Sequence, residues 1–435
     1  MRVRETLDRE LATFRWRFAI AVVLAGLHLF AFARAAHDRL DLPFNAAPDE
    51  APHFSRPEAW VLGGYPREPK RWSRLAASRW DAQVYIGFAL RGLSSCPDAP
   101  TDDETMTDFA YMQCGLGWFQ AYGLVGGAVA RTFDLPVDYV LLAISVLAAI
   151  GVSLLWTSRF VVDRIGRFEA FATLLAYNMF PSAFYTVAPY TESATLALVL
   201  GGLWMISKQR WFGAALLVGA STALRASAVS FAFAFAVTAV VAALQLRRRA
   251  TRQWWRPLAA MPLAGWGVAV QFVALQIAVG DWRAFMRARS LYGDQRDFSR
   301  LIDPVFYLKG FTAQHMDSVM LVGGTAMVLL VVRTLWRKLG TVEATFVTVA
   351  SIAGIALAIT TVHEYWGLNR YLLLCPVLFL SLGLVARRYP VLFVGWLLVC
   401  AFLYWNVELC SYVTHGRPDL CPCLGRLEWW APYAS

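Results

Sequence analysis

The sequence predicts an all-α polytopic membrane protein, a bundle of about 11 transmembrane helices with a large first extracytoplasmic loop. Of the 435 residues, 58% are hydrophobic and 16% are charged, whereas soluble domains average roughly 45–50% apolar and about 25% charged residues. The apolar residues stand in long uninterrupted blocks, which are typical of membrane spans. Arginines and lysines gather in the short segments between these blocks. These observations exclude a soluble enzyme, a disordered tail and a disulfide-rich secreted protein.

The blocks define a single transmembrane domain over residues 16–407, after a cytoplasmic N-terminus of residues 1–15. Several blocks are shorter than the ~20 residues that a helix needs to cross hydrocarbon, so we expect some boundaries to shift. A further stretch at residues 116–131 is short and rich in glycine. The predicted spans cover residues 16–36, 138–158, 169–188, 191–207, 211–225, 227–246, 257–280, 316–333, 341–361, 369–386 and 389–407.

The basic residues predict how the chain crosses the membrane, because short loops rich in Lys and Arg favour the cytoplasm. Residues 1–17 hold five arginines, and no cleavage-type motif follows the first block. We therefore interpret this end as a retained signal anchor. All basic loops share the cytoplasmic side only if residues 116–131 do not cross, so we expect an interfacial or re-entrant helix there. The basic loop residues are Arg159, Arg164, Arg167, Lys208, Arg210, Arg247, Arg248, Arg249, Arg252, Arg256, Arg333, Arg337, Lys338, Arg387 and Arg388.

This topology places two large segments outside the membrane, a first loop of residues 37–115 and a second loop of residues 281–315. It also places the C-terminal tail, residues 408–435, on that side. Segments longer than about 12–15 residues are usually functional or disordered. Because the first loop contains many Trp, Tyr and Phe residues, we expect it to pack on the mouth of the bundle through amphipathic helices.

Charge and cysteine content narrow the possible partners. The chain has 40 basic and 30 acidic residues and a net charge of +10, but the basic residues form no stripe, so we expect no nucleic-acid partner. The seven cysteines include no CxxC pair, which argues against a structural zinc site and a thioredoxin-like redox centre. No metal-ligand cluster is evident in the sequence, and we expect no cofactor. Five cysteines fall outside the membrane, where Cys96–Cys114 and one bond within the tail are the simplest disulfides. Cys375 and Cys400 lie in spans and are interpreted as small apolar residues.

The first outer loop contains the motif Arg79-Trp80-Asp81, with Tyr85 about one helical turn further on. Trp80 and Val84 follow helical spacing, which predicts a helix in the membrane interface with Asp81 at its start. A carboxylate beside an aromatic ring at a membrane surface sits in a reduced dielectric, where its proton affinity can be tuned for general-base work. The alternative is that Asp81 caps the helix and Trp80 anchors it among lipid headgroups.

A second polar cluster is the turn Pro189-Tyr190-Thr191-Glu192. Pro189 holds Ala188 in an extended conformation and ends one helix, and Thr191 and Glu192 begin the next. A helix N-terminus at this depth exposes backbone amides that bind anions. The alternative is an ordinary capped turn, in which Glu192 occupies a favourable first-turn position.

Two further arginines, Arg225 and Arg370, lie at span ends, and Arg370 belongs to the outer turn that begins at His363. Either arginine alone extends to the surface or binds an anion. Together with the two clusters above, these arginines form a set of charged and aromatic residues on the outer side. Such a set suits the binding of a phosphate leaving group and of a sugar that stacks on aromatic rings.

Several function classes lack their signatures. Apart from His28, the span interiors contain essentially no ionisable residue, whereas ion-coupled transporters hold such groups near the bilayer midplane. The sequence has no Walker loop, no HExxH and no GxSxG motif, so an NTPase, a metalloprotease and a serine hydrolase are disfavoured.

The order of the motifs resembles one enzyme family. Arg79-Trp80-Asp81 follows the first span, the run Phe180-Pro181-Ser182-Ala183-Phe184 leads into Ala188-Pro189-Tyr190-Thr191-Glu192-Ser193, and a short span ends at Arg225. This order looks like the mannosyltransferases of the phosphatidylinositol-glycan class V type, within the polytopic GT-C glycosyltransferase superfamily. The resemblance covers residues 80–227.

The resemblance implies a polyprenyl-phosphate-linked sugar donor, usually a hexose such as mannose, and transfer on the extracytoplasmic face. The acceptor is then a hydroxyl of a lipid or glycan, and Asp81 is the catalytic general base. Direct displacement with one base predicts inversion at the anomeric carbon. The expected substrate-binding residues are Arg79, Trp80, Tyr85, Tyr190, Glu192, Arg225, His363 and Arg370.

Such an enzyme would contact membrane lipids in the inner membrane of a bacterium or the endoplasmic reticulum membrane of a eukaryote. Two alternatives remain open: a GT-C enzyme that uses another lipid-linked sugar, and a non-catalytic flippase for the lipid carrier.

Overall fold

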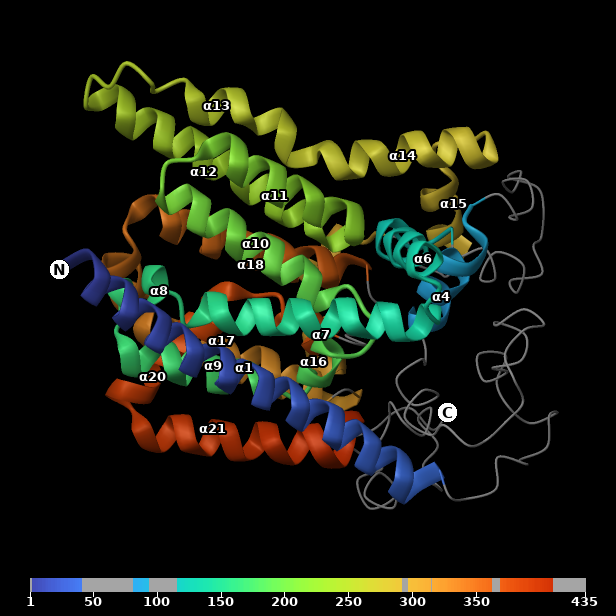
Figure 1. Cartoon of the computed structure of the whole chain (residues 1–435), viewed down its shortest axis with the longest axis horizontal. Coiled ribbons are helices and arrows are strands. Elements are labelled where there is room, and N and C mark those ends of the chain that lie inside the picture. The colour runs from blue at the N-terminus through green and yellow to red at the C-terminus, as the bar shows by residue number, and fades with distance from the viewer. Residues whose placement is uncertain are drawn as a thin grey trace.

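The structure is a computed structural model, and it describes residues 2–40, 81–93, 116–291, 296–313, 315–361 and 368–409. All regular elements in these ranges are helices, and the ranges contain no β-strand. The predicted all-α class is therefore confirmed. Most of the helices run along the long axis of the molecule (Figure 1).

Seven stretches of the described chain are helical, long and apolar enough to cross a membrane. They make the chain a multi-pass membrane protein, as the sequence predicts. The helices that form them are α1 (Arg2–Leu40), α7 (Val137–Trp156) with α8 (Arg159–Ile165), η3 (Ala226–Ala228) with α12 (Val229–Arg248), α13 (Arg256–Ala260) with η4 (Met261–Gly265) and α14 (Trp266–Val279), α17 (His315–Leu339), α18 (Thr341–Thr361), and α21 (Pro390–Leu403) with η7 (Tyr404–Glu408).

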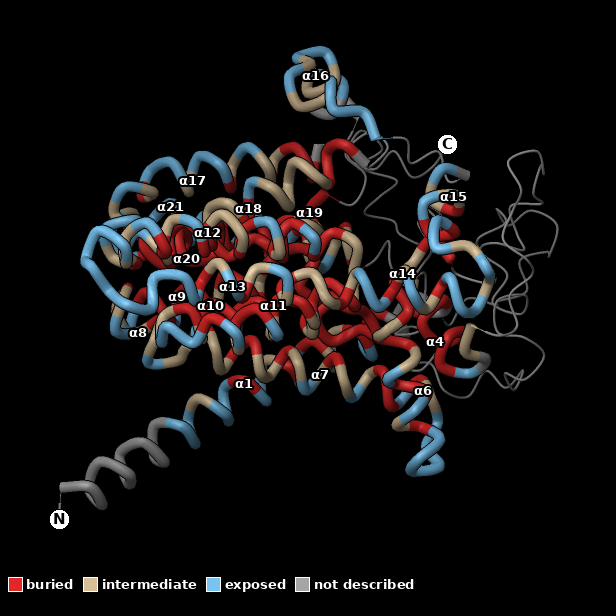
Figure 2. Tube along the Cα trace, turned by 90° about the horizontal axis from the view of Figure 1, so that it is seen from above, coloured by how far each residue is buried: buried red, intermediate tan, exposed pale blue. Residues whose placement is uncertain are grey.

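Four shorter helices lie among the long ones, and two of them, Glu192–Ser207 and Trp211–Leu224, are apolar. They are α9 (Arg167–Asn178), α10 (Glu192–Ser207), α11 (Trp211–Leu224) and α20 (Pro376–Arg388). α10 packs against α7 and α11, and α9 packs against α20. Almost every residue of α20 is buried, and more than half of the residues of α9, α10 and α11 are buried. Figure 2 shows the buried residues concentrated in the middle of the bundle.

The outer surface of the bundle is apolar, as a lipid-facing surface must be. Large hydrophobic side chains point outward from many of the long helices. Ile277 is 80% exposed, Leu329 68%, Val391 83% and Leu147 67%. In a soluble protein such contiguous apolar exposure would favour aggregation, whereas hydrocarbon solvates it at no cost.

The two ends of the bundle differ in character. The N-terminus and the turns that carry the basic residues lie together at the left in Figure 1, and α4 (Asp81–Arg91), α6 (Ala121–Phe133) and α15 (Ala284–Leu291) lie at the right. At the basic end, Arg164 pairs with Glu343 and Arg387 pairs with Glu169, each at 2.9 Å. The basic loops thus share one end of the bundle, as their expected common orientation requires.

Two predicted spans are interrupted by proline. Residues 169–188 are predicted as one span that ends at Pro189, but α9 ends at Asn178 and is followed by the short helix η2 (Ala183–Thr186). Pro181 explains the difference, because proline has no amide hydrogen to continue the helix and restricts the residue before it. Pro376 likewise separates α19 (Leu368–Leu372) from α20, within the predicted span 369–386.

The glycine-rich segment 116–131 forms α6, which packs beside α4 and does not run the length of the bundle (Figure 1). With 13 residues, α6 is about 20 Å long, which is too short for the roughly 30 Å of bilayer hydrocarbon. A side chain at Gly127 would collide with the Ala89 backbone. The glycines therefore allow α6 to approach α4 closely and to fix its position.

The remaining described elements also lie toward the end that carries α4. They are η5 (Phe298–Leu301) and α16 (Pro304–Ala313), which follow α15, and α19, which lies between α18 and α20. The turn containing η2 joins α9 to α10 at the same end. α4, η2, the turn between α11 and η3, α15 and α19 thus lie toward the same end of the bundle (Figure 1).

Candidate functional site

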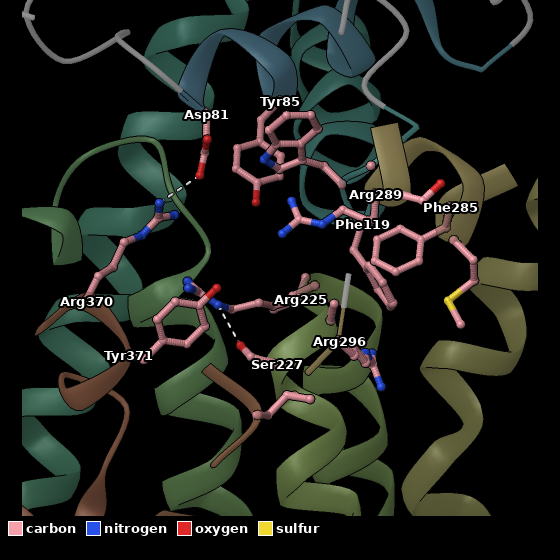
Figure 3. A pocket seen from close by; sticks show the side chains of 17 residues that line it. Asp81, Tyr85, Phe119, Arg225, Ser227, Phe285, Arg289, Arg296, Arg370 and Tyr371 are labelled. Atoms are coloured by element: carbon pink, nitrogen blue, oxygen red, sulfur yellow. Dashed lines mark hydrogen bonds and ion pairs between the residues drawn. The ribbon is translucent and has the colours of Figure 1, made fainter. Parts of the chain in front are cut away.

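A cavity of about 240 Å³ lies where these segments converge (Figure 3). Its lining residues come from α4, from the segment before α6, from the α11–η3 turn, from α15 and the residues after it, and from α18 and α19. The wall therefore combines parts of the chain that are up to 290 positions apart, from Asp81 to Tyr371. Only the folded bundle brings them together.

Asp81 stands at the first turn of α4, and its carboxylate lines the cavity. Its side chain keeps 26% of its surface exposed. Tyr85, one turn further along α4, is almost fully buried and also lines the cavity. An acidic first-turn residue stabilises its own helix through the helix dipole, so a position at the start of α4 is compatible with a place in the cavity lining.

Glu192 is the centre of a charge cluster next to the cavity. It begins α10 and is fully buried. Its Oε1 accepts hydrogen bonds from Arg225 Nη1 and from Arg370 Nε. Burial of a charge is costly unless the charge is paired and hydrogen-bonded, so these two guanidinium groups are what keeps the Glu192 carboxylate in the interior.

Arg370 connects Glu192 to Asp81. Its Nη1 donates to Asp81 Oδ2 at 2.7 Å, and its guanidinium carbon lies 4.5 Å from the centre of the Tyr190 ring and 4.9 Å from that of Tyr185. Burial lowers the pKa of Arg370, but the negative charges of Glu192 and Asp81 outweigh this effect and hold its pKa well above the ordinary value. Arg370 is therefore a fixed cation that orients the Asp81 carboxylate.

Arg225 forms the floor of the cavity. It lies in an extended conformation between α11 and η3, its Nε donates to Ser227 Oγ at 2.7 Å, and its guanidinium carbon lies 4.9 Å from the centre of the Tyr371 ring. Only 10% of its side chain is exposed. Figure 3 shows Arg225 below Asp81 and Tyr85, with Tyr371 beside it.

Two more arginines line the cavity, and neither belongs to the site predicted from the sequence. Arg289 comes from α15, and Arg296 follows four residues that lie outside the described ranges. Both belong to the predicted second outer loop, 281–315. One signal in the sequence was available: Phe285 and Arg289 are four residues apart, so a helix there presents both on one face.

The lining is strongly cationic. Four arginines and one carboxylate face the cavity, namely Arg225, Arg289, Arg296, Arg370 and Asp81. The rest of the wall is largely aromatic and aliphatic, with Trp118, Phe119, Leu224, Phe285, Met286 and Leu357. An arginine-rich cavity with apolar walls suits an anion that is attached to an apolar body.

The predicted site residues fall into three groups. Asp81, Tyr85, Arg225 and Arg370 line the cavity. Tyr190 and Glu192, predicted to bind substrate, are fully buried and do not line it; they hold Arg370 in place. Arg79, Trp80 and His363 lie outside the described residues, as do the tail 408–435 beyond Leu409 and the five cysteines predicted to face outward. Cys375 and Cys400 are buried and unpaired.

The arrangement places one carboxylate opposite several guanidinium groups in a half-enclosed space. No protein-family model matches the sequence, and no curated protein matches it either.

Within the described ranges, no group of three His, Cys, Asp or Glu residues lies close enough to hold a metal ion. The cavity lining offers a proton acceptor, Asp81, and anion-stabilising guanidinium groups, which together can serve a displacement in which an anion departs.

Proposed function

We propose that the protein is a membrane glycosyltransferase. It moves a hexose, with mannose as the first candidate, from a polyprenyl-phosphate-linked donor to a hydroxyl of a lipid or glycan acceptor on the extracytoplasmic face. One observation carries the proposal: Asp81 lines the same cavity as four arginines, at the end of the bundle opposite the basic turns.

The orientation follows from the distribution of charge. If the basic turns face the cytoplasm, the cavity opens on the opposite side. The four short helices α9, α10, α11 and α20 then cross with the seven long ones and complete a bundle of about 11 spans, and residues 37–115 form the first outer loop. A donor that carries its sugar on a lipid reaches such a cavity from the membrane.

In the proposed reaction, Asp81 acts as the general base. Arg370 holds one carboxylate oxygen, Oδ2, and the other oxygen accepts the proton of the acceptor hydroxyl. The acceptor oxygen then forms a bond to the anomeric carbon, and the bond from that carbon to the phosphate oxygen breaks. The polyprenyl phosphate leaves with the electron pair. A single displacement of this kind inverts the anomeric configuration.

The arginines supply the electrostatic part of the reaction. Negative charge accumulates on the departing phosphate, and guanidinium groups in a partly desolvated cavity stabilise that charge in the transition state. Typical small-molecule pockets measure roughly 300–1,000 Å³, and the 240 Å³ cavity lies below that range. A single phosphate-linked hexose therefore suits it better than a bulkier nucleotide-sugar.

Glu192 serves the reaction indirectly. Because it is fully buried behind the cavity wall, it does not touch the sugar, and it acts instead as a positioning residue for Arg225 and Arg370. Glu192 accepts a hydrogen bond from Arg370, and Arg370 donates a second one to Asp81. These two contacts fix the orientation of the Asp81 carboxylate.

The direct test is transfer by the purified full-length protein. The protein is reconstituted in liposomes with polyprenyl-phosphate-[³H]mannose and a mixture of lipid acceptors, and labelled products are separated from the donor. We expect a new labelled lipid or glycan that grows with time and with protein. Translocation of the donor across the bilayer without formation of any new glycoside would contradict the proposal and would instead support a flippase.

A further inference from the structure

The turn between α12 and α13 holds the densest run of arginines in the chain. Its arginines are Arg247, Arg248, Arg249, Arg252 and Arg256, and every residue from Arg247 to Arg256 is exposed. The turn lies at the left in Figure 1, at the end of the bundle that carries the N-terminus and opposite to α4. It is therefore a concentrated positive charge outside the cavity.

The arginines of this turn differ from other basic residues at the same end, which have partners within the protein. Arg164 pairs with Glu343, and Arg387 pairs with Glu169. In the part of the chain that the structure describes, none of the five turn arginines pairs with a carboxylate. The sequence explains the difference, because residues 193–280 contain no Asp and no Glu. The charge of the turn thus acts on whatever lies outside the protein.

Two tryptophans stand among these arginines. Trp254 is 37% exposed and Trp255 is 50% exposed, and the guanidinium carbon of Arg247 lies 5.6 Å from the centre of the Trp254 ring. One membrane span ends at Arg248 and the next begins at Arg256, so the turn starts and finishes at the membrane surface. Tryptophan is enriched at that level, where its ring meets lipid headgroups.

Backbone hydrogen bonds give the turn a defined shape. The Ala250 amide donates to the Arg247 carbonyl at 2.9 Å, the Thr251 amide donates to the Leu246 carbonyl at 3.0 Å, and the Trp254 amide donates to the Thr251 carbonyl at 3.2 Å. A surface that is already ordered loses less conformational entropy when a ligand binds. The arginines and tryptophans are therefore presented together before any ligand arrives.

We propose that this turn is a binding surface for anionic phospholipids of the leaflet beside it. Its arginines hold the phosphate-bearing headgroups, and Trp254 and Trp255 lie against the first carbons of the acyl chains. Guanidinium groups bind phosphate oxygens with two parallel hydrogen bonds, and basic clusters directly beside a membrane span attract anionic lipids.

The exposed indole rings favour a lipid over a soluble anion. A soluble phosphate compound would neutralise the arginines but would leave both rings in water, whereas a phospholipid covers the rings as well. The binding surface does not depend on the proposed sugar transfer, because none of its residues lines the cavity.

The test counts the lipids that bind to the purified full-length protein, by native mass spectrometry in a neutral detergent. The protein is titrated with phosphatidylglycerol and with phosphatidylcholine of identical acyl chains. We expect tighter binding of phosphatidylglycerol. Each arginine near an anionic lipid contributes roughly fivefold in affinity, so the triple substitution Arg248→Gln, Arg249→Gln and Arg252→Gln should weaken phosphatidylglycerol binding about 100-fold and leave phosphatidylcholine binding unchanged.

The matched control removes the same number of positive charges elsewhere at the same end of the bundle. It carries Arg167→Gln, Arg333→Gln and Arg337→Gln, and all three of these arginines are exposed. The control should bind phosphatidylglycerol as the unmodified protein does. Equal weakening in the two triple variants would overturn the proposal, because affinity would then follow net charge alone. A matching loss of phosphatidylcholine binding in the turn variant would overturn it too, since lipid affinity in general would have been lost.

Glycerol 3-phosphate separates a lipid from a soluble ligand, because it carries the phosphate without the acyl chains. We expect it to leave phosphatidylglycerol bound when the two are present at equal concentrations. Displacement of the lipid under these conditions would assign the arginines to a soluble phosphate compound and would contradict the lipid surface.

Discussion

At the scale of single residues, Glu192 holds two of the site's charged side chains in place from behind the cavity wall, because it pairs with both Arg225 and Arg370. It is fully buried and bridges two guanidinium groups. Such an arrangement is only weakly stabilising as a whole, but removal of one member leaves the other charges uncompensated. The two arginines, and through Arg370 the proposed base Asp81, therefore depend on one carboxylate that does not line the cavity.

We predict that Glu192→Gln destabilises the protein by about 3–5 kcal/mol, the usual result of breaking a buried ion pair. Thermal unfolding of the protein in detergent, followed by tryptophan fluorescence, measures the effect. Glu343→Gln is the control: Glu343 pairs with Arg164, whose side chain is 36% exposed, and loss of such a pair costs about 0–1 kcal/mol. Equal effects of the two substitutions would contradict the central role of Glu192.

Arg370 gives a second prediction at this scale. Arg370→Lys keeps the positive charge but replaces the planar guanidinium group with a single ammonium group. The ammonium group cannot bind Glu192 and Asp81 at the same time, and it cannot stack on the Tyr190 ring as a guanidinium does. A misplaced base lowers the rate of the chemical step by roughly 10- to 100-fold, so we expect kcat to fall while the donor KM changes little.

Steady-state kinetics of mannose transfer measure both parameters. Arg387→Lys, which alters a pair with Glu169 at the opposite end of the bundle, should leave both unchanged. A larger donor KM with an unchanged kcat in Arg370→Lys would mean that Arg370 binds the donor and does not orient Asp81.

At the scale of elements, the close contact of α6 with α4 fixes where Asp81 stands. Gly123 and Gly127 of α6 face the backbone of α4, and a side chain at Gly127 would overlap Ala89. Backbone atoms cannot move aside as a flexible side chain can, so α4 itself must shift if a methyl group is added.

We predict that Gly127→Ala destabilises the protein by about 1–3 kcal/mol, as overpacking does. It should also lower the proposed transfer activity, because α4 carries the proposed base Asp81. Thermal unfolding and the transfer assay measure the two effects. Gly151→Ala in α7 is the control, since nothing lies within 4 Å of the added carbon; it should be neutral or slightly stabilising. Full activity of Gly127→Ala would show that α4 tolerates displacement.

The elements also show what the sequence could and could not predict. The helical spacing of Trp80 and Val84 predicts a helix through Asp81 and Val84, and both residues lie in α4. The break at Pro181 was missed because the apolar run continues through it, and hydropathy does not register the missing amide hydrogen. Arg289 was missed because an arginine in a loop reads as a surface residue until the packing of α15 is known.

At the scale of the whole molecule, the sequence predicts the end at which the site lies but not the depth of its members. The charge rule groups the basic turns at one end, and the structure brings Asp81, Arg225 and Arg370 together at the other (Figure 1). The spacing of residues along the chain does not show how deeply a side chain is buried behind a cavity wall. For this reason Glu192 was predicted to meet the substrate and instead lies fully buried behind the wall.

The orientation itself gives a prediction. Single cysteines are introduced at Thr251 and at Ser299, both exposed, in a variant whose native cysteines are replaced by serine. If the basic turns face the cytoplasm, a membrane-impermeant thiol reagent added to intact cells labels position 299 at once and position 251 only after permeabilisation. The reverse pattern would place the cavity on the cytoplasmic side.

The most direct measurement for the whole account is mannose transfer by the Asp81→Asn protein beside Asp297→Asn, whose carboxylate lies outside the cavity lining. Loss of a general base lowers rates by roughly 10²–10⁴-fold. We predict a loss of that size for Asp81→Asn, with normal yield, unfolding temperature and binding of polyprenyl phosphate, and full activity for Asp297→Asn. Transfer by Asp81→Asn at the rate of the unmodified protein would contradict the role of Asp81 and with it the proposed mechanism.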